Sequence, residues 1–133
     1  EECPKQDDAP GSGEAFRLSK ELTLLQLYCD SGAYNFMSRF WLVAGADARG
    51  ARPIAFPSPE GKADATLTNP DYDPKRGVLS FFAKGRGVGD CGVMGEYAWT
   101  GARFELASWA QMLECAGVPG ENGGWPALWR TRR

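Results

Sequence analysis

Few side chains in this sequence have the type and spacing that catalysis requires. Glu96 and Glu105 flank a predicted hairpin turn, and a pair of carboxylates is what glycoside hydrolysis uses. We expect these two residues to face each other across the hairpin as solvated charges, with a carboxylate-dependent hydrolase as an alternative. Ser80 and Lys84 would lie about 13 Å apart along a strand, which is too far for a Ser–Lys dyad.

The composition removes several familiar kinds of active site. The 133 residues include no histidine, so the commonest general base, the Ser–His and Cys–His nucleophile systems and histidine-ligated zinc are all absent. Lys and Arg number 15 against 17 Asp and Glu, and this balance gives no broad electrostatic reason to expect a nucleic-acid partner. We therefore predict a protein that is not an enzyme and that needs no cofactor or metal ion.

Two loops carry residues that can bind ions. Lys84 and Arg86 flank alternating glycines that end at Asp90, and the main-chain amides of such a loop can form an anion-binding nest. The run NPDYDP at 69–74 offers oxygen ligands at a calcium-like spacing, but it lacks the glycine and distal glutamate of an EF-hand. A glycine-rich strand connection and Asx turns are the simpler interpretations.

The four cysteines lie at wide spacing, at Cys3, Cys29, Cys91 and Cys115, and none forms a CxxC pair. Two disulfides are the economical interpretation, and disulfides persist in oxidising compartments. Of three possible connectivities we favour Cys3–Cys29 and Cys91–Cys115, because each closes a loop of about 25 residues, worth roughly 3 kcal/mol in the chain-entropy model. The alternative is four reduced, buried thiols in a cytosolic protein.

The start of the chain bears on its compartment. It reads Glu-Glu-Cys without a methionine, and no apolar run in the chain is long enough to span a bilayer. We interpret it as a mature or trimmed protein whose export signal is missing, and expect an oxidising, extracytoplasmic location. A lipid anchor on Cys3 is an alternative, although an anchoring cysteine would normally be residue 1 of the mature chain.

Period-two hydrophobic patterns predict strands that must position these residues. Residues 36–43 and 78–83 are apolar on both faces, as expected for central strands. Residues 93–99 and 104–109 alternate on either side of Thr100-Gly101, which predicts a hairpin.

Three segments are less distinct. Residues 22–29 fit either a helix or a strand, and we favour a strand because the neighbouring segments are strands. Residues 108–114 fit either a short helical turn or a continuation of the hairpin arm. Pro126 is compatible with the start of an edge strand.

These patterns predict an all-β, mainly antiparallel fold. We expect a small sandwich or barrel of about six to eight strands, braced by two disulfides and with at most short helical turns. Residues 1–14 are polar and rich in Pro, Gly and Asp, which predicts an N-terminal arm, and residues 15–133 are predicted to form a single β domain.

Three segments together resemble a known family: YCDSGAYN at 28–35, NPDYDPKRGVLSFFAKGRGVGDCG at 69–92, and YAWTGARFELASWAQMLECAG at 97–117, which leads to WPALWR. They are similar to the bacterial periplasmic family catalogued as domain of unknown function 1176, found mainly in Proteobacteria. The resemblance covers about residues 20–133, and Cys29, Cys91 and Cys115 match cysteines of the family. Many members look longer, with another segment ahead of this region. The resemblance implies a bacterial protein with a periplasmic or secreted location and supports the β fold, but it implies no reaction.

Binding is the leading hypothesis for function. We expect a module that binds a periplasmic or secreted protein, and specifically an inhibitor or immunity protein against a cell-wall-degrading enzyme. A cell-wall glycan-binding module is the alternative if exposed tryptophans line a groove.

Two kinds of residue are candidates for the contact. The loops around Tyr34 and Asn35, and from Lys84 through Arg86 to Asp90, interrupt the strand pattern, and loops on a rigid scaffold are common binding devices. Aromatic side chains can stack on sugar rings or anchor a protein partner. Trp125 and Trp129, near the basic C-terminal residues, are therefore expected at the surface.

Overall fold

The computed structural model of the chain describes residues 13–31, 35–45, 50–85, 89–115, 117, 120 and 125–130, and for residues 30, 31 and 128–130 it describes the main chain only. Every regular element in these residues is a β-strand, and every strand pair that they form is antiparallel. The prediction of an all-β, mainly antiparallel fold is confirmed. In the same part of the chain, no helix is long and apolar enough to cross a membrane.

The first sheet is built from the N-terminal part of the chain. Its strands β1 (Gly13–Arg17), β2 (Leu22–Ser31), β3 (Phe36–Ala44) and β4 (Arg52–Pro53) pair in that order, and β7 (Thr66–Thr68) also pairs with β3. The ambiguous segment 22–29 is therefore a strand, as favoured. Leu24 is fully buried and Leu27 is 40% exposed, because even-numbered and odd-numbered residues of the strand point to opposite faces of the sheet.

The second sheet is built mainly from the C-terminal part. Its strands pair in the order β12 (Ala127–Arg130), β11 (Phe104–Met112), β10 (Gly92–Trp99), β9 (Val78–Lys84) and β8 (Asp71–Asp73). Residues 108–112 continue the hairpin arm rather than forming a helical turn. Pro126 directly precedes the edge strand β12, as predicted.

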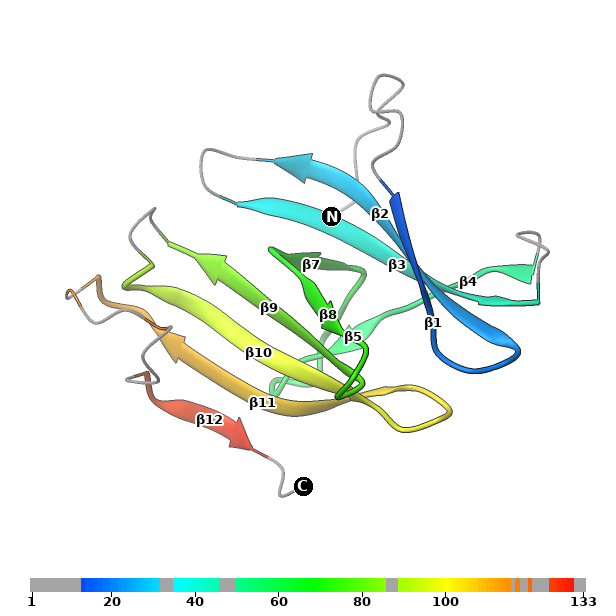
Figure 1. Ribbon diagram of the computed structural model, residues 1–133. Coiled ribbons are helices and arrows are strands. Elements are labelled where there is room, and N and C mark those ends of the chain that lie inside the picture. Colours follow the sequence, from blue (N-terminus) through cyan, green and yellow to red (C-terminus); the bar gives the residue numbers. More distant parts are fainter. Residues whose placement is uncertain are drawn as a thin grey trace.

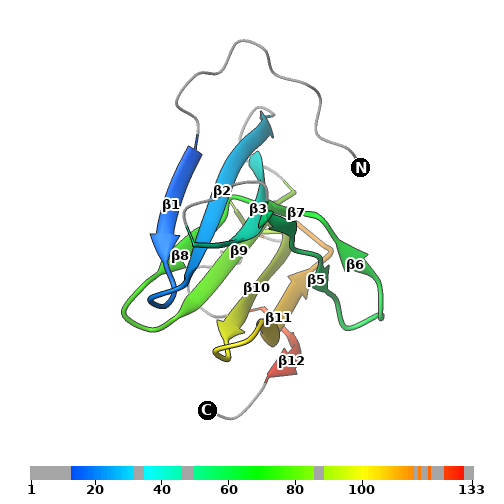
Figure 2. The same ribbon diagram turned by 90° about the vertical axis from the view of Figure 1, so that its right-hand side faces the viewer.

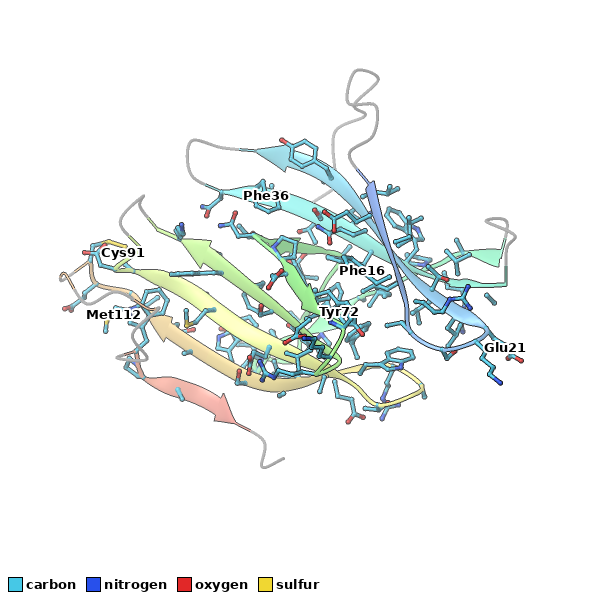
Figure 3. The ribbon with its side chains drawn as sticks, in the orientation of Figure 1. Phe16, Glu21, Phe36, Tyr72, Cys91 and Met112 are labelled. Atoms are coloured by element: carbon cyan, nitrogen blue, oxygen red, sulfur yellow. A yellow bond between two sulfur atoms is a disulfide. The ribbon has the colours of Figure 1, made fainter. Side chains whose placement is uncertain are left out.

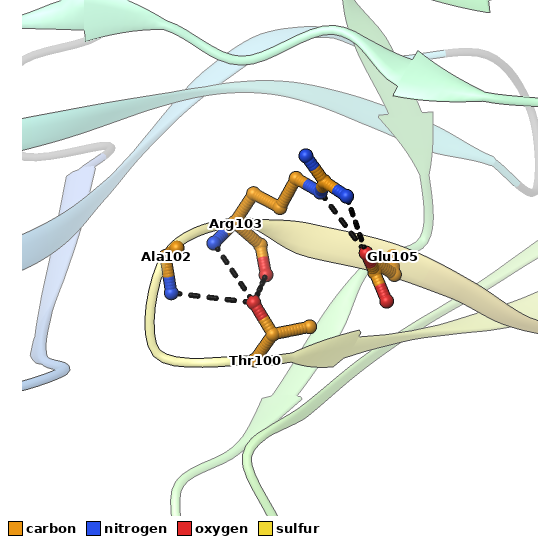
Figure 4. Close-up of polar contacts among 4 residues, drawn as sticks. All are labelled: Thr100, Ala102, Arg103 and Glu105. Carbon is orange, nitrogen blue, oxygen red and sulfur yellow. Dashed lines mark hydrogen bonds and ion pairs between the residues drawn. The ribbon is translucent and has the colours of Figure 1, made fainter.

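The predicted hairpin is β10–β11, and its connection is centred one residue later than Thr100-Gly101. The Thr100 amide donates to the Arg103 carbonyl at 2.9 Å, and the Thr100 hydroxyl oxygen accepts from the amides of Ala102 and Arg103 (Figure 4). Gly101 has a φ of 100°, which a residue with a side chain rarely adopts. The turn residues that close the hairpin are therefore Gly101 and Ala102.

A short excursion links one edge of the first sheet to the second sheet. After β4 the chain forms the two-stranded pair β5 (Phe56–Pro57) and β6 (Ala63–Asp64), and then returns to β3 as β7. Figure 2 shows β5 and β6 together at one side of the molecule. Phe56 is only 1% exposed, and its ring contacts Phe40 of the first sheet and Tyr97 of the second at centroid distances of 5.6 and 5.1 Å.

The core lies between the two sheets, which form separate layers in Figure 1. Figure 3 shows Phe16 of β1 and Tyr72 of β8 in this space, and their ring centroids are 5.2 Å apart. The arrangement is a sandwich. The buried cluster consists of Leu24, Phe40, Phe56, Leu67, Tyr72, Leu79, Phe81, Tyr97 and Phe104.

The strand count needs one correction. The described residues form twelve strand segments, against six to eight predicted, but only seven of the segments are four residues or longer. The other five, β4 to β8, have two or three residues each, which is too short to show a period of two.

The predicted Cys91–Cys115 disulfide is present, with a Cα–Cα distance of 4.7 Å. It is the one disulfide among the described pairs, where the sequence predicted two. Cys29 is buried and also disulfide-bonded, while its predicted partner Cys3 lies outside the described residues.

Four connections gather at one end of the sandwich: β2–β3, β7–β8, β9–β10 and β11–β12. We call this the loop end. In Figure 3 Phe36, Cys91 and Met112 lie at this end, and Glu21 lies in the β1–β2 turn at the opposite end.

Candidate binding surface at the loop end

The chain crosses from the first sheet to the second at Asn69. This residue follows β7, which pairs with β3, and precedes β8, which pairs with β9. Its main-chain amide donates to the Phe36 carbonyl at 2.7 Å, and its side-chain oxygen accepts from the Phe36 amide at 3.0 Å. Its side-chain nitrogen donates to the carbonyl of Phe82 in the second sheet at 2.7 Å. Asn69 therefore joins the two sheets at the loop end.

Asn35 makes a second connection between the sheets. Its side-chain nitrogen donates to the Lys84 carbonyl at 2.8 Å, and its side-chain oxygen accepts from the Lys84 amide at 3.1 Å. The same oxygen accepts from the side-chain nitrogen of Asn69 at 2.7 Å. We call Asn35 and Asn69 the asparagine bridge. It places two of the predicted binding residues, Asn35 and Lys84, in direct contact although they lie far apart in the sequence.

Asp90 joins the β9–β10 connection to the β11–β12 connection at the loop end. It is 1% exposed, and its carboxylate accepts from the Gly117 amide at 2.8 Å, next to the Cys91–Cys115 disulfide. The Gly120 amide donates to the Gly89 carbonyl at 3.0 Å. Asp90 was predicted to bind a partner, but its burial gives it a structural role in holding these loops together.

Trp125 is buried, with 6% exposure, and this corrects the expectation of a surface position. Its ring packs edge-on against Phe82 of β9 at a centroid distance of 5.4 Å. This contact with a strand of the second sheet explains the burial of Trp125. Lys84 is half-buried, and its ammonium lies 5.7 Å from the centroid of the same Phe82 ring.

Three predicted binding residues are not placed in full. Tyr34 and Arg86 lie outside the described residues, as does most of the proposed anion nest. For Trp129 the structure describes only the main chain, which lies opposite Trp109 in the β11–β12 pair. Of the nest, the Gly85 amide donates to the Cys91 carbonyl at 2.8 Å, so this amide is used within the protein.

The two candidate carboxylates do not face each other, and this part of the hypothesis is wrong. The turn is centred one residue later than predicted, which places Glu105 opposite Ala98, and a bulge after Glu96 then places Glu96 opposite Ser108. Glu96 contacts the Arg76 guanidinium at 3.7 Å, whereas Glu105 contacts that of Arg103 at 2.8 Å (Figure 4). The alternating pattern shows neither the exact position of the turn nor the bulge.

The run at 69–74, which has a calcium-like spacing, uses the Asp73 carboxylate for hydrogen bonds to main-chain amides. Asp73 accepts hydrogen bonds from the amides of Lys75 and Arg76, which forms the expected Asx turn. Asp90, Cys91 and Cys115 have ligand atoms within 4.8 Å of one another, but the two sulfur atoms are bonded together and do not offer thiolates.

The asparagine bridge is the part of this surface that sequence reasoning missed. Asn35 was predicted as a contact residue, and Asn69 only as a turn residue or calcium ligand. The available signal was an asparagine directly before a predicted strand and another before a proline, but such residues are common in turns. Only the pairing of β7 with β3 and of β8 with β9 brings the two together.

Comparison with known proteins places the chain in a family. A relative from Escherichia coli strain K12, named "Uncharacterized protein YpfG", is 33% identical over 119 residues, which is 86% of this chain and 34% of the relative. The chain thus spans about a third of the length of the curated relative that it matches. No solved structure matches it. The family model described as "Protein of unknown function (DUF1176)" matches residues 1–132, and the chain therefore belongs to the DUF1176 family.

Proposed function

We propose that this chain is a periplasmic or secreted binding module that recognises another protein through its loop end. The observation that carries the proposal is the asparagine bridge, which joins connections from both sheets into one braced surface. Loops that are already held in place lose less conformational entropy when they bind, so a braced surface suits recognition.

The disulfide chemistry supports the compartment. Cys91 and Cys115 are paired with each other, Cys29 is also disulfide-bonded, and no described cysteine is free. Disulfides of this structural kind persist in oxidising compartments, and the periplasm is one of these.

Lys84 supports a more specific version, an inhibitor or immunity protein against a cell-wall-degrading enzyme. Its ammonium rests over the Phe82 ring, and its main chain is held by Asn35 on both its amide and its carbonyl. The positive charge is therefore presented from a defined position. Glycan-cleaving enzymes use acidic residues in their active sites, and a fixed cation at a rigid edge complements such a surface.

The test is affinity capture with a charge-reversed bait. Wild-type protein and the Lys84→Glu variant are each immobilised and exposed to a periplasmic extract, and the retained proteins are quantified by mass spectrometry. We expect one protein that the wild type retains and that Lys84→Glu retains at least about tenfold less, because charge reversal at an interface weakens binding strongly. The captured protein is then assayed for cleavage of purified peptidoglycan, which the wild-type chain should suppress.

Lys75→Glu is the matched control. Lys75 is an exposed lysine in the turn between β8 and β9, at the opposite end of the sandwich, so its reversal changes net charge equally. The proposal fails if the extract yields no reproducibly retained protein. It also fails if Lys75→Glu and Lys84→Glu weaken retention to the same extent.

A further inference from the structure

A cleft lies between the β5–β6 excursion and the inner face of the second sheet. Its volume is about 470 Å³, within the range of about 300–1,000 Å³ that is typical of small-ligand sites. Residues from β5, β6, β7, β9, β10 and β11 line it. Lys84 and the two residues of the asparagine bridge do not line it, so the cleft does not depend on the function proposed for the loop end.

One wall of the cleft is a row of aromatic rings. Phe81 is stacked with Tyr97 at an interplanar angle of 28°, and its centroid is 5.3 Å from that of Trp109. Trp109 is the most accessible of these rings, being half-buried, and its indole nitrogen donates to the side-chain oxygen of Gln111 at 3.3 Å. This bond holds the indole in one orientation, with its ring available at the cleft.

The opposite side of the cleft is polar. The Asp64 carboxylate accepts from both the amide and the hydroxyl of Thr66, at 3.1 and 3.2 Å, which fixes its position at the rim. Glu60 and Lys62 line the cleft from the β5–β6 connection, and both are exposed. Among the interactions of the described chain, neither has an ion-pair partner.

This combination limits the chemistry of a ligand. A purely apolar molecule would remove the rim carboxylates from water without replacing their hydrogen bonds. A strongly charged molecule would meet charges of both signs. A pyranose ring presents an apolar face of C–H groups, which an aromatic ring covers, and an edge of hydroxyl groups, which carboxylates and an ammonium hydrogen bond. We propose that this cleft binds a neutral saccharide of one or two pyranose rings, with Trp109 against the apolar face and Asp64, Glu60 and Lys62 on the hydroxyls.

The site also has the rigidity that a saccharide requires. The Tyr97 hydroxyl donates to the Pro57 carbonyl at 2.7 Å and so fastens the excursion to the second sheet. Phe56 anchors the same excursion in the core. A weak ligand can then bind without first ordering the wall on either side.

The experiment is a titration of isotope-labelled protein followed by ¹H–¹⁵N NMR. The probes are three disaccharides: cellobiose, maltose and N,N′-diacetylchitobiose. We expect at least one of them to shift the indole N–H resonance of Trp109 and the amides of residues 62–68, with a dissociation constant on the order of 1 mM. A double variant, Glu60→Gln with Lys62→Ala, should weaken that binding about tenfold or more, since both residues lie on an exposed turn where the fold does not need them.

The matched control is Lys20→Ala with Glu21→Gln, which removes a similar exposed acid–base pair in the β1–β2 turn. It should bind as the wild type does. The proposal is overturned if none of the three sugars shifts the Trp109 indole resonance up to about 20 mM. It is also overturned if the shifts map to the loop end, or if the two double variants lose affinity equally. Failure here leaves the loop-end capture experiment unaffected, because that experiment uses a different surface and no sugar.

Discussion

The side-chain nitrogen of Asn69 donates a 2.7 Å hydrogen bond to the side-chain oxygen of Asn35, at the point where the chain passes from one sheet to the other. Asn69 has a φ of 48°, in the left-handed region that asparagine tolerates better than most residues with a side chain. The residue thus combines an unusual main-chain conformation with hydrogen bonds to both sheets, and two substitutions can separate these contributions.

Asn69→Gly keeps the left-handed conformation available but removes the side-chain bonds to Phe36, Asn35 and Phe82. We expect the free energy of unfolding to fall by about 2 kcal/mol, since each such bond contributes modestly. Asn69→Ala also adds main-chain strain, and should cost about 1 kcal/mol more. Urea denaturation followed by tryptophan fluorescence measures both, and equal losses would show that the backbone conformation is unimportant.

The hydroxyl of Tyr97 is the polar contact that ties the β5–β6 excursion to the second sheet, through the Pro57 carbonyl. Tyr97→Phe removes the donor and leaves the ring in place, so we expect a loss of about 1–2 kcal/mol in the free energy of unfolding. Tyr72→Phe is the control, because Tyr72 is also buried but its hydroxyl makes no hydrogen bond in the described part of the chain. A Tyr72→Phe loss as large as that of Tyr97→Phe would contradict the assignment.

Alkaline pH should destabilise the fold through the same residue. Burial, with the charge of Asp64 as a smaller cause, raises the pKa of Tyr97 well above its ordinary value of 10. Above pH 10 the unfolded chain has lost the phenol proton of Tyr97, while the folded chain still keeps it. The protonated phenol therefore contributes fully to the free energy of unfolding below about pH 10. Above about pH 10 this contribution falls by about 1.4 kcal/mol per pH unit.

The measurement is the free energy of unfolding in urea at several values between about pH 8 and pH 11. Above about pH 10 the free energy of unfolding of the wild type should fall more steeply with pH than that of Tyr97→Phe. The difference should be about 1.4 kcal/mol per pH unit, which corresponds to one proton. Burial, and secondarily Asp73, also raises the pKa of Tyr72, which is present in both proteins and leaves a residual slope in the variant. Identical slopes would exclude Tyr97 as the cause.

The Phe81 ring of the aromatic row packs so close to Gly95 that there is no room for a side chain at this position. Gly95 lies opposite Phe81 on one neighbouring strand and Trp109 on the other, and an added Cβ would come within 2.6 Å of the Phe81 ring and 2.7 Å of the Ser108 carbonyl. We expect Gly95→Ala to lower the free energy of unfolding by about 2 kcal/mol, because the core is overpacked. Gly50→Ala, where a Cβ meets nothing within 4 Å, should change it by less than about 0.5 kcal/mol. Chemical denaturation of both variants makes the comparison.

Local patterns were sufficient for much of the fold. The two-faced apolar runs became the paired interior strands β3 and β9, and the alternating arms around residue 100 became the β10–β11 hairpin. The Cys91–Cys115 pairing followed from loop length. These features depend on periodicity and on short separations along the chain, which a sequence displays directly.

Other features depended on contacts between distant segments. Trp125 is buried because its ring packs against Phe82 of a distant strand. Glu96 and Glu105 lie apart because the hairpin turn is centred one residue later than predicted, and a bulge displaces Glu96 further. Similarly, Asn35 contacts Lys84 only because the two sheets are stacked. The same stacking places the aromatic row and the Asp64 carboxylate around one cleft. The sequence by itself determined which segments are strands, because hydrophobic alternation is local. The tertiary structure alone decided which side chains share a surface, because this depends on strand order, register and the packing of one sheet on the other.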